Sequence, residues 1–211
     1  MTMSIVDYEL PYDTHNLYDV TLDTHQIHTL VTHTPSMVDT WFSDTLRGHH
    51  STPQSLIVGI DFEWRPNFSR QVDNPIATLQ LCIGNCCLIF QIMHAPSIPQ
   101  SLIDFLGNAV HTFVGVGIQN DVEKLLIDYG FGVANMVDLG DLAARKLGVR
   151  ELRNSGLKGL AKEVLGMEIV KPKRVTMSRW DTEWLTYDQV QYACIDAFLS
   201  YEIGRQLNDR V

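Results

Sequence analysis

Hydrophobic and polar positions alternate with two different periods along the chain, which predicts strands and helices in mixed order. Residues 18–22 and 26–31 alternate with a period of two around a short polar turn and predict a hairpin. Residues 56–64 are almost continuously apolar apart from two acids, which indicates a strand covered on both faces. The first fifteen residues show no period and are expected to form a tail or to cover a sheet edge.

Further along the chain, short apolar runs at 76–83 and 86–92 predict two more strands that complete a meander. The run at 112–116 predicts a buried strand that leads directly into a helix. The last helix has the clearest signal. Thr186 and Gln189 form a capping-box pattern ahead of an apolar face that continues nearly to the end of the chain.

Composition supports one globular domain spanning residues 1–211, because 45% of the 211 residues are hydrophobic. The chain has 25 acidic and 16 basic residues, and its net charge is -9. This balance argues against broad electrostatic adhesion to nucleic acid or to an anionic membrane. It leaves a nucleic-acid enzyme open, because divalent cations bound at a site offset the acids there.

No run approaches the roughly 20 apolar residues of a membrane span, and no secretion signal opens the sequence. An intracellular protein is therefore expected, in the nucleus or the cytoplasm, with no membrane partner.

Asp61 and Glu63 stand two residues apart in the predicted central strand, so both side chains leave the same face. Neighbouring carboxylates repel each other, which raises the pKa of at least one of them unless a cation is bound. Mg2+ and Mn2+ prefer such oxygen ligands. The alternative is a polar strand end that faces solvent.

Tyr192 and Asp196 stand four residues apart on the last predicted helix and therefore share one face. Asp196 lies inside the apolar run YACIDAFL, where an unpaired charge is costly. A buried partner such as a metal ion would remove that cost. The alternative is a solvated charge beside an ordinary amphipathic tyrosine.

Asp121 is expected in the first turn of the helix that follows the strand at 112–116. An acid at this position interacts favourably with the helix dipole. Capping and participation in a site therefore explain Asp121 equally well.

Together these segments resemble the three exonuclease motifs of the DnaQ-like family. The motifs are VGIDFEW at 58–64, FVGVGIQND at 113–121 and YACID at 192–196. The histidine subtype has its general base five residues before the last acid, where this chain has Gln191, so the chain resembles the tyrosine (DEDDy) subtype. It resembles the Werner-syndrome-type exonuclease domain more than it resembles RNase D.

The resemblance implies an α/β, RNase H-like fold with a five-stranded mixed sheet flanked by helices, and metal-dependent 3'-5' exonuclease activity. It also implies two ions, Mg2+ or Mn2+. Asp61, Glu63 and Asp196 would bind one ion, and Asp61 would bridge to a second ion with Asp121 in its outer shell. Tyr192 would orient the attacking water, because a phenol with a pKa of about 10 is a poor base at neutral pH.

Residues 167–184 are expected to form a loop that crosses the surface near the site. Its basic side chains would contact substrate phosphates or serve as a nuclear address, and a solvated loop is an equal alternative. Trp64 and Trp180 would shape the cleft, although core positions explain them equally well. The basic residues in question are Lys171, Lys173, Arg174 and Arg179.

Nucleic acid is the expected partner, with DNA favoured and RNA possible. An RNase D-like exoribonuclease stays open, because no residue in the chain can be named as a reader of the 2'-hydroxyl. A catalytically weak nuclease-like module that binds nucleic acid also stays open. The acidic balance favours that module, and the intact motifs oppose it. A homo-oligomer is possible.

Overall fold

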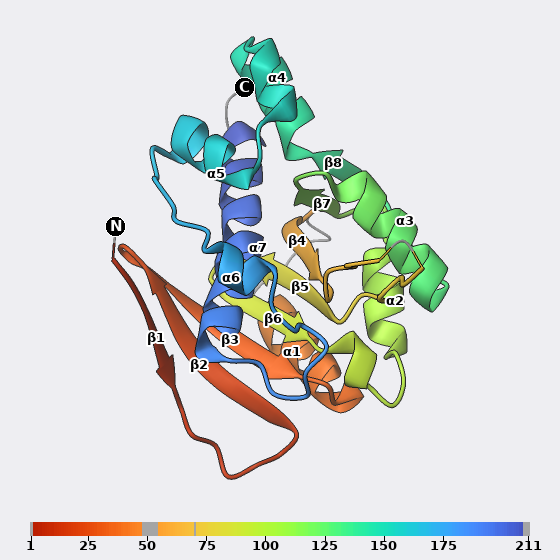
Figure 1. Ribbon diagram of the computed structural model, residues 1–211. Coiled ribbons are helices and arrows are strands. Elements are labelled where there is room, and N and C mark those ends of the chain that lie inside the picture. Colours follow the sequence, from red (N-terminus) through yellow and green to blue (C-terminus); the bar gives the residue numbers. More distant parts are fainter. Residues whose placement is uncertain (1, 48–54, 70, 209–211) are drawn as a thin grey trace.

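The computed structural model describes residues 2–47, 55–69 and 71–208. In this part of the chain, eight strands form one sheet in the order β1-β2-β3-β6-β5-β4-β7-β8 (Figure 1). The strands are β1 (Met3–Asp7), β2 (His15–Leu22), β3 (His25–Thr32), β4 (Ile57–Glu63), β5 (Thr78–Ile83), β6 (Cys86–Phe90), β7 (Thr112–Gly115) and β8 (Met136–Asp138).

The sheet is mixed, as expected. Antiparallel pairs join β1 to β2, β2 to β3, β6 to β5 and β5 to β4, whereas β3 with β6, β4 with β7 and β7 with β8 are parallel. The five strands β6-β5-β4-β7-β8 correspond to the expected sheet. The count of five is too small, because β1, β2 and β3 extend the sheet beyond β6.

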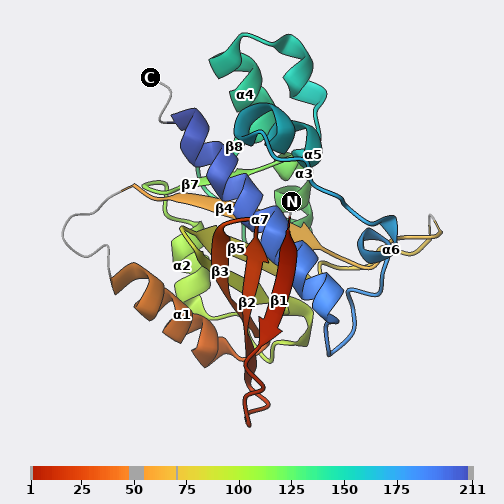
Figure 2. The ribbon, with the colours of Figure 1, turned by 90° about the vertical axis from the view of Figure 1, so that its left-hand side faces the viewer.

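Helices cover both faces of the sheet (Figures 1 and 2). One apolar cluster joins the sheet to α1, α2 and α3, and a second joins its other face to α4, α5 and α7. The helices are α1 (Pro35–Arg47), α2 (Gln100–Leu106), α3 (Ile118–Tyr129), α4 (Leu139–Leu147), α5 (Leu157–Leu160), α6 (Lys173–Thr176) and α7 (Tyr187–Asn208), with short turns η1 (Ile92–His94), η2 (Arg150–Asn154) and η3 (Ala161–Leu165).

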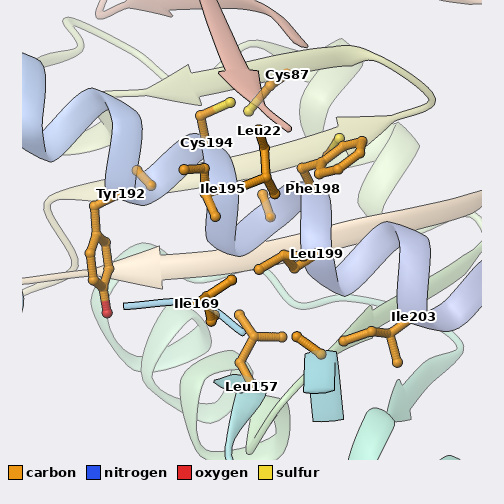
Figure 3. Packing of buried hydrophobic residues seen from close by; sticks show 14 of the residues in the cluster. Leu22, Cys87, Leu157, Ile169, Tyr192, Cys194, Ile195, Phe198, Leu199 and Ile203 are labelled. Atoms are coloured by element: carbon orange, nitrogen blue, oxygen red, sulfur yellow. The ribbon is translucent and has the colours of Figure 1, made fainter. Parts of the chain in front are cut away.

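Helix α7 is buried on two sides, which explains its long apolar sequence. Cys194 and Phe198 lie over the sheet near Leu22, whereas Leu199 points away from the sheet toward Leu157 of α5 (Figure 3). In a helix with apolar neighbours on two sides, an unpaired charge near the middle has a high desolvation cost. Asp196 lies at such a position.

Gly59 lets α7 lie directly on the central strand β4. A Cβ atom at this position would stand 2.1 Å from the carbonyl oxygen of Ala197 and 2.6 Å from the backbone nitrogen of Tyr201. Both neighbours are backbone atoms of α7, so a side chain at 59 would push the helix off the strand. The glycine therefore sets the spacing between the strand and the helix.

The expected hairpin and capping box are both present. Strands β2 and β3 pair around Asp23, which has a positive φ of 51°. The backbone nitrogen of Thr186 donates to the side-chain oxygen of Gln189 at 2.9 Å, and that of Gln189 donates to the Thr186 hydroxyl at 3.3 Å. These reciprocal bonds satisfy two donors at the start of α7.

Two segments differ from the sequence prediction. Residues 3–7, expected to form a tail or to cover a sheet edge, do cover the edge of β2, but as the regular strand β1, in which Ile5 packs against the core. So short and exposed a strand shows no clear period. The expected loop at 167–184 contains the short helix α6, anchored by the buried Val175. Among the described residues, no helix has the length and apolar character needed to span a bilayer.

Candidate active site

Three carboxylates from two elements converge between β4 and α7. Asp61 and Glu63 leave β4 on the face that α7 covers, because Ile60 and Phe62 point to the opposite cluster. Asp196 projects from the middle of α7. One oxygen atom from each of the three acids lies within 4.8 Å of the others.

Burial and mutual repulsion make these acids hard to ionise together. Burial, followed by the charge of Asp196, raises the pKa of Asp61 to about 8. Burial, followed by the charge of Asp61, raises the pKa of Glu63 well above its ordinary value. A divalent cation would remove this repulsion, and carboxylate oxygens are the ligands that Mg2+ and Mn2+ prefer. The donor set therefore fits such an ion.

Asp121 lies in the first turn of α3, as expected, and belongs to the edge of this cluster. It is outside the group of three, yet its charge raises the pKa of both Asp61 and Glu63. Burial raises the pKa of Asp121 to about 6. The carboxylate of Asp138 accepts from the backbone nitrogen of Gly117 at the start of α3, at 2.7 Å.

Tyr192 lies beside Asp196 at the border of the cluster. Its hydroxyl accepts a hydrogen bond from the hydroxyl of Thr176 at 3.3 Å, and its ring lies 5.9 Å from that of Trp180. Burial, followed by the charge of Asp196, raises its pKa to about 12. The phenol is thus protonated at neutral pH and can donate a hydrogen bond.

Lys171 of the expected basic loop pairs with Asp196, a contact that the sequence did not indicate. Its ammonium nitrogen lies 2.5 Å from Oδ2 of Asp196 and 4.9 Å from the centre of the Tyr192 ring. Burial, the largest single effect, lowers the pKa of Lys171, but the charge and hydrogen bond of Asp196 and the smaller effects of Tyr192 together raise this pKa overall. Only 4% of the Asp196 side chain is exposed, so the lysine provides the cation that this buried carboxylate requires. No sequence spacing marks this contact.

The other predicted residues lie outside the cluster. Arg174 forms an ion pair with Asp188 at 2.7 Å, and Arg179 lies 3.4 Å from Asp181. Trp64 is half-buried with the ammonium of Lys124 5.8 Å from its ring centre. Trp180 is fully buried beneath Tyr192, so it is a core residue. Lys173 is exposed.

Gly59 is a further residue with a role at the site that the sequence analysis missed. It brings the helix that carries Asp196 against the strand that carries Asp61. The sequence does contain a signal for this role, because a glycine inside an apolar strand often marks a place where another backbone approaches closely.

A mixed sheet whose central strand and crossing helix bring three carboxylates together has the architecture of an RNase H-like nuclease. The profile of the 3'-5' exonuclease family matches residues 39–211, and the chain belongs to this family. The family and the fold expected from the sequence are thereby confirmed. The matched segment begins after β1, β2 and β3.

Several known proteins are similar to this chain. A 3'-5' exonuclease of Arabidopsis thaliana is 37% identical over 154 residues, which cover 72% of this chain and 52% of that protein. The bifunctional 3'-5' exonuclease/ATP-dependent helicase WRN of Mus musculus is 36% identical over 154 residues, covering 72% of this chain and 11% of that protein. The chain thus spans about half or less of the length of these relatives.

Among solved structures, Escherichia coli RNase D, an exoribonuclease, has a TM-score of 0.69 at 17% identity. The match covers 85% of this chain and 44% of that chain. This likeness concerns the fold alone.

Proposed function

We propose that the protein is a metal-dependent 3'-5' exonuclease that removes nucleoside 5'-monophosphates from nucleic-acid 3' ends, with DNA as the favoured substrate. The convergence of three carboxylate oxygens within 4.8 Å carries this proposal. Membership of the 3'-5' exonuclease family supports it.

Asp61, Glu63 and Asp196 would hold one Mg2+ or Mn2+ ion, and Asp61 would also bind a second ion with Asp121 in its outer shell. When bound, such ions offset the charge of the phosphate and lower the pKa of a coordinated water. The protein contributes the fixed arrangement of its carboxylates and the exclusion of solvent by α7. Trp64, Lys173, Arg174 and Arg179 are proposed to contact the substrate strand around this centre.

The test of this function is a titration of Mg2+ and Mn2+ with matched single-stranded DNA and RNA that carry labels at known ends. Mononucleotides released stepwise from the 3' end, and only with metal, are the expected products. Faster shortening of RNA would favour the exoribonuclease alternative. Tight binding without any shortening would favour the catalytically weak module.

Tyr192→Phe should lower kcat about 100-fold, because the phenol is proposed to orient the attacking water and the variant cannot donate that hydrogen bond. The affinity for DNA should stay the same. Single-turnover shortening of 3'-labelled DNA gives the rate, and fluorescence anisotropy gives the affinity. Tyr201→Phe, the same change further along α7, serves as the control. Unchanged turnover in Tyr192→Phe would contradict the orienting role.

Lys171→Gln should bind Mn2+ at least about tenfold more tightly when no substrate is present. The ammonium of Lys171 pairs with Asp196, so a cation entering the site must displace or repel it. Electron paramagnetic resonance of free Mn2+ measures this affinity without any reaction. Lys173→Gln removes the same charge from an exposed position and should change the affinity less than about twofold. Equal or weaker binding by Lys171→Gln would show that the lysine does not compete with the cation.

A further inference from the structure

The loop between α6 and α7 carries two tryptophans in opposite environments. Trp180 is fully buried, whereas Trp184 is 59% exposed. A large apolar ring in water is unfavourable, so a well-held exposed tryptophan is a common feature of binding surfaces. Trp184 contributes little to the hydrophobic core, so the packing of the fold does not explain its position.

The loop holds Trp184 in place through hydrogen bonds to its backbone. The side-chain amide of Gln91 donates to the carbonyl oxygens of Thr182 at 3.3 Å and Glu183 at 2.8 Å. The hydroxyl of Thr182 lies 3.0 Å from the carbonyl oxygen of Trp184 and 3.1 Å from that of Arg179. The indole is thus presented on a fixed backbone, which lowers the entropy cost of binding a ligand against it.

Arg174, Arg179 and Trp184 line one hollow of about 340 Å³. The two arginine side chains are 73% and 67% exposed, so each has donors free to meet an anion despite its ion pair. Residues 171–190 contain four basic and three acidic residues, a local charge of +1 in a chain of net charge -9. The hollow therefore lies in a locally basic segment of an acidic protein.

This hollow adjoins the pocket that Tyr192 and Asp196 line, because Val175 and Asp188 line both. Trp180 of the same loop packs against Tyr192, and Arg65, two residues after Glu63, lies 3.3 Å from Asp181 of the loop. The loop is therefore fastened both to α7 and to the segment that leaves β4. The hollow therefore lies beside the carboxylate cluster.

We infer that the hollow binds an unpaired nucleotide of the substrate strand, next to the one that is removed. Its base stacks on Trp184, and its phosphates meet Arg174 and Arg179. Aromatic rings and arginines together bind single strands without regard to sequence, because every base has a stacking face. The inference rests on the proposed function and makes its substrate an unpaired 3' end.

The test compares two substrates, only one of which has a neighbouring nucleotide that could occupy the hollow. One is a single-stranded oligothymidylate, and the other is thymidine 5'-monophosphate p-nitrophenyl ester, which has a scissile phosphodiester but no neighbouring nucleotide. Trp184→Ala should raise KM for the oligonucleotide about tenfold and leave both kinetic constants for the ester unchanged. Trp184→Phe should restore most of the lost affinity. Tyr12→Ala removes another exposed aromatic ring, 61% exposed, and should change nothing.

A second arm measures oligonucleotide binding by anisotropy in the Asp61→Asn background, where turnover is blocked. Adding Trp184→Ala should weaken binding about tenfold. Unchanged binding and KM would overturn the inference and leave the proposed function intact. An equal loss on both substrates would also overturn it, because it would indicate a structural role. Failure of the unaltered protein to hydrolyse the ester and the oligonucleotide would instead contradict the proposed function, and the binding arm would still decide the inference.

Discussion

Asp61→Asn is expected to lower kcat for Mg2+-dependent shortening of 3'-labelled DNA by at least about 1000-fold. Asparagine preserves the shape of the side chain but removes a charge from the centre of the three-carboxylate cluster. Bound metal stabilises the transition state by several kcal/mol, and about 4 kcal/mol corresponds to a factor of about 1000. A gel assay of the labelled strand measures the loss. Asp104→Asn, an exposed acid on α2, is the matched control.

The same variant should be at least as stable as the unaltered protein, which separates lost chemistry from lost folding. The pKa of Asp61 is raised to about 8, mainly by burial, above its value in the unfolded chain. A raised pKa means that the group contributes stability at low pH, and that this contribution is lost as the pH rises toward 8. Asparagine does not ionise, so the stability of the variant does not fall in this way as the pH rises.

With metal removed by EDTA, Asp61→Asn should therefore melt at a temperature that increasingly exceeds that of the unaltered protein between about pH 5 and pH 8. Retention of more than a tenth of the activity by this variant would reject the site assignment. A variant that melts lower at pH 8 would contradict the proposed repulsion among the acids.

Gly59→Ala is expected to destabilise the fold by about 3 kcal/mol or more and to lower activity as well. The new methyl group would stand 2.1 Å from a backbone oxygen of α7, and no rotamer change can relieve such a contact. The helix must move away from β4, which separates Asp196 from Asp61. Urea unfolding monitored by circular dichroism measures the loss of stability.

Gly132→Ala provides the comparison, because a Cβ atom there meets nothing within 4 Å. Its stability should change by less than about 1 kcal/mol. If the two alanine variants unfold at the same urea concentration, α7 does not depend on close contact with the strand at Gly59.

The sequence was sufficient wherever a local pattern determines the structure. The spacing of Asp61 and Glu63 placed both acids on one face of a strand, and the spacing of Thr186 and Gln189 placed the start of α7. Asp196 could be recognised because an acid inside an apolar helix needs a partner. These inferences depend on the side-chain periods of strands and helices, which are the same in every protein.

Features that depend on distant parts of the chain were missed. Lys171 reaches Asp196 only because its loop folds back over α7, and no period relates two positions 25 residues apart. Strand β1 exists because the edge of β2 offers it hydrogen-bonding partners, not because residues 3–7 have a strong pattern of their own. In both cases the tertiary context determined the outcome.

The position of α7 after all eight strands has a consequence for protein synthesis. A ribosome produces β4, with Asp61 and Glu63, long before it produces the helix that carries Asp196. Until that helix emerges, the part of the sheet that α7 covers is exposed, and the growing chain needs protection against aggregation. We expect the nascent chain to lack nuclease activity until α7 is made, because the third carboxylate of the cluster is synthesised last.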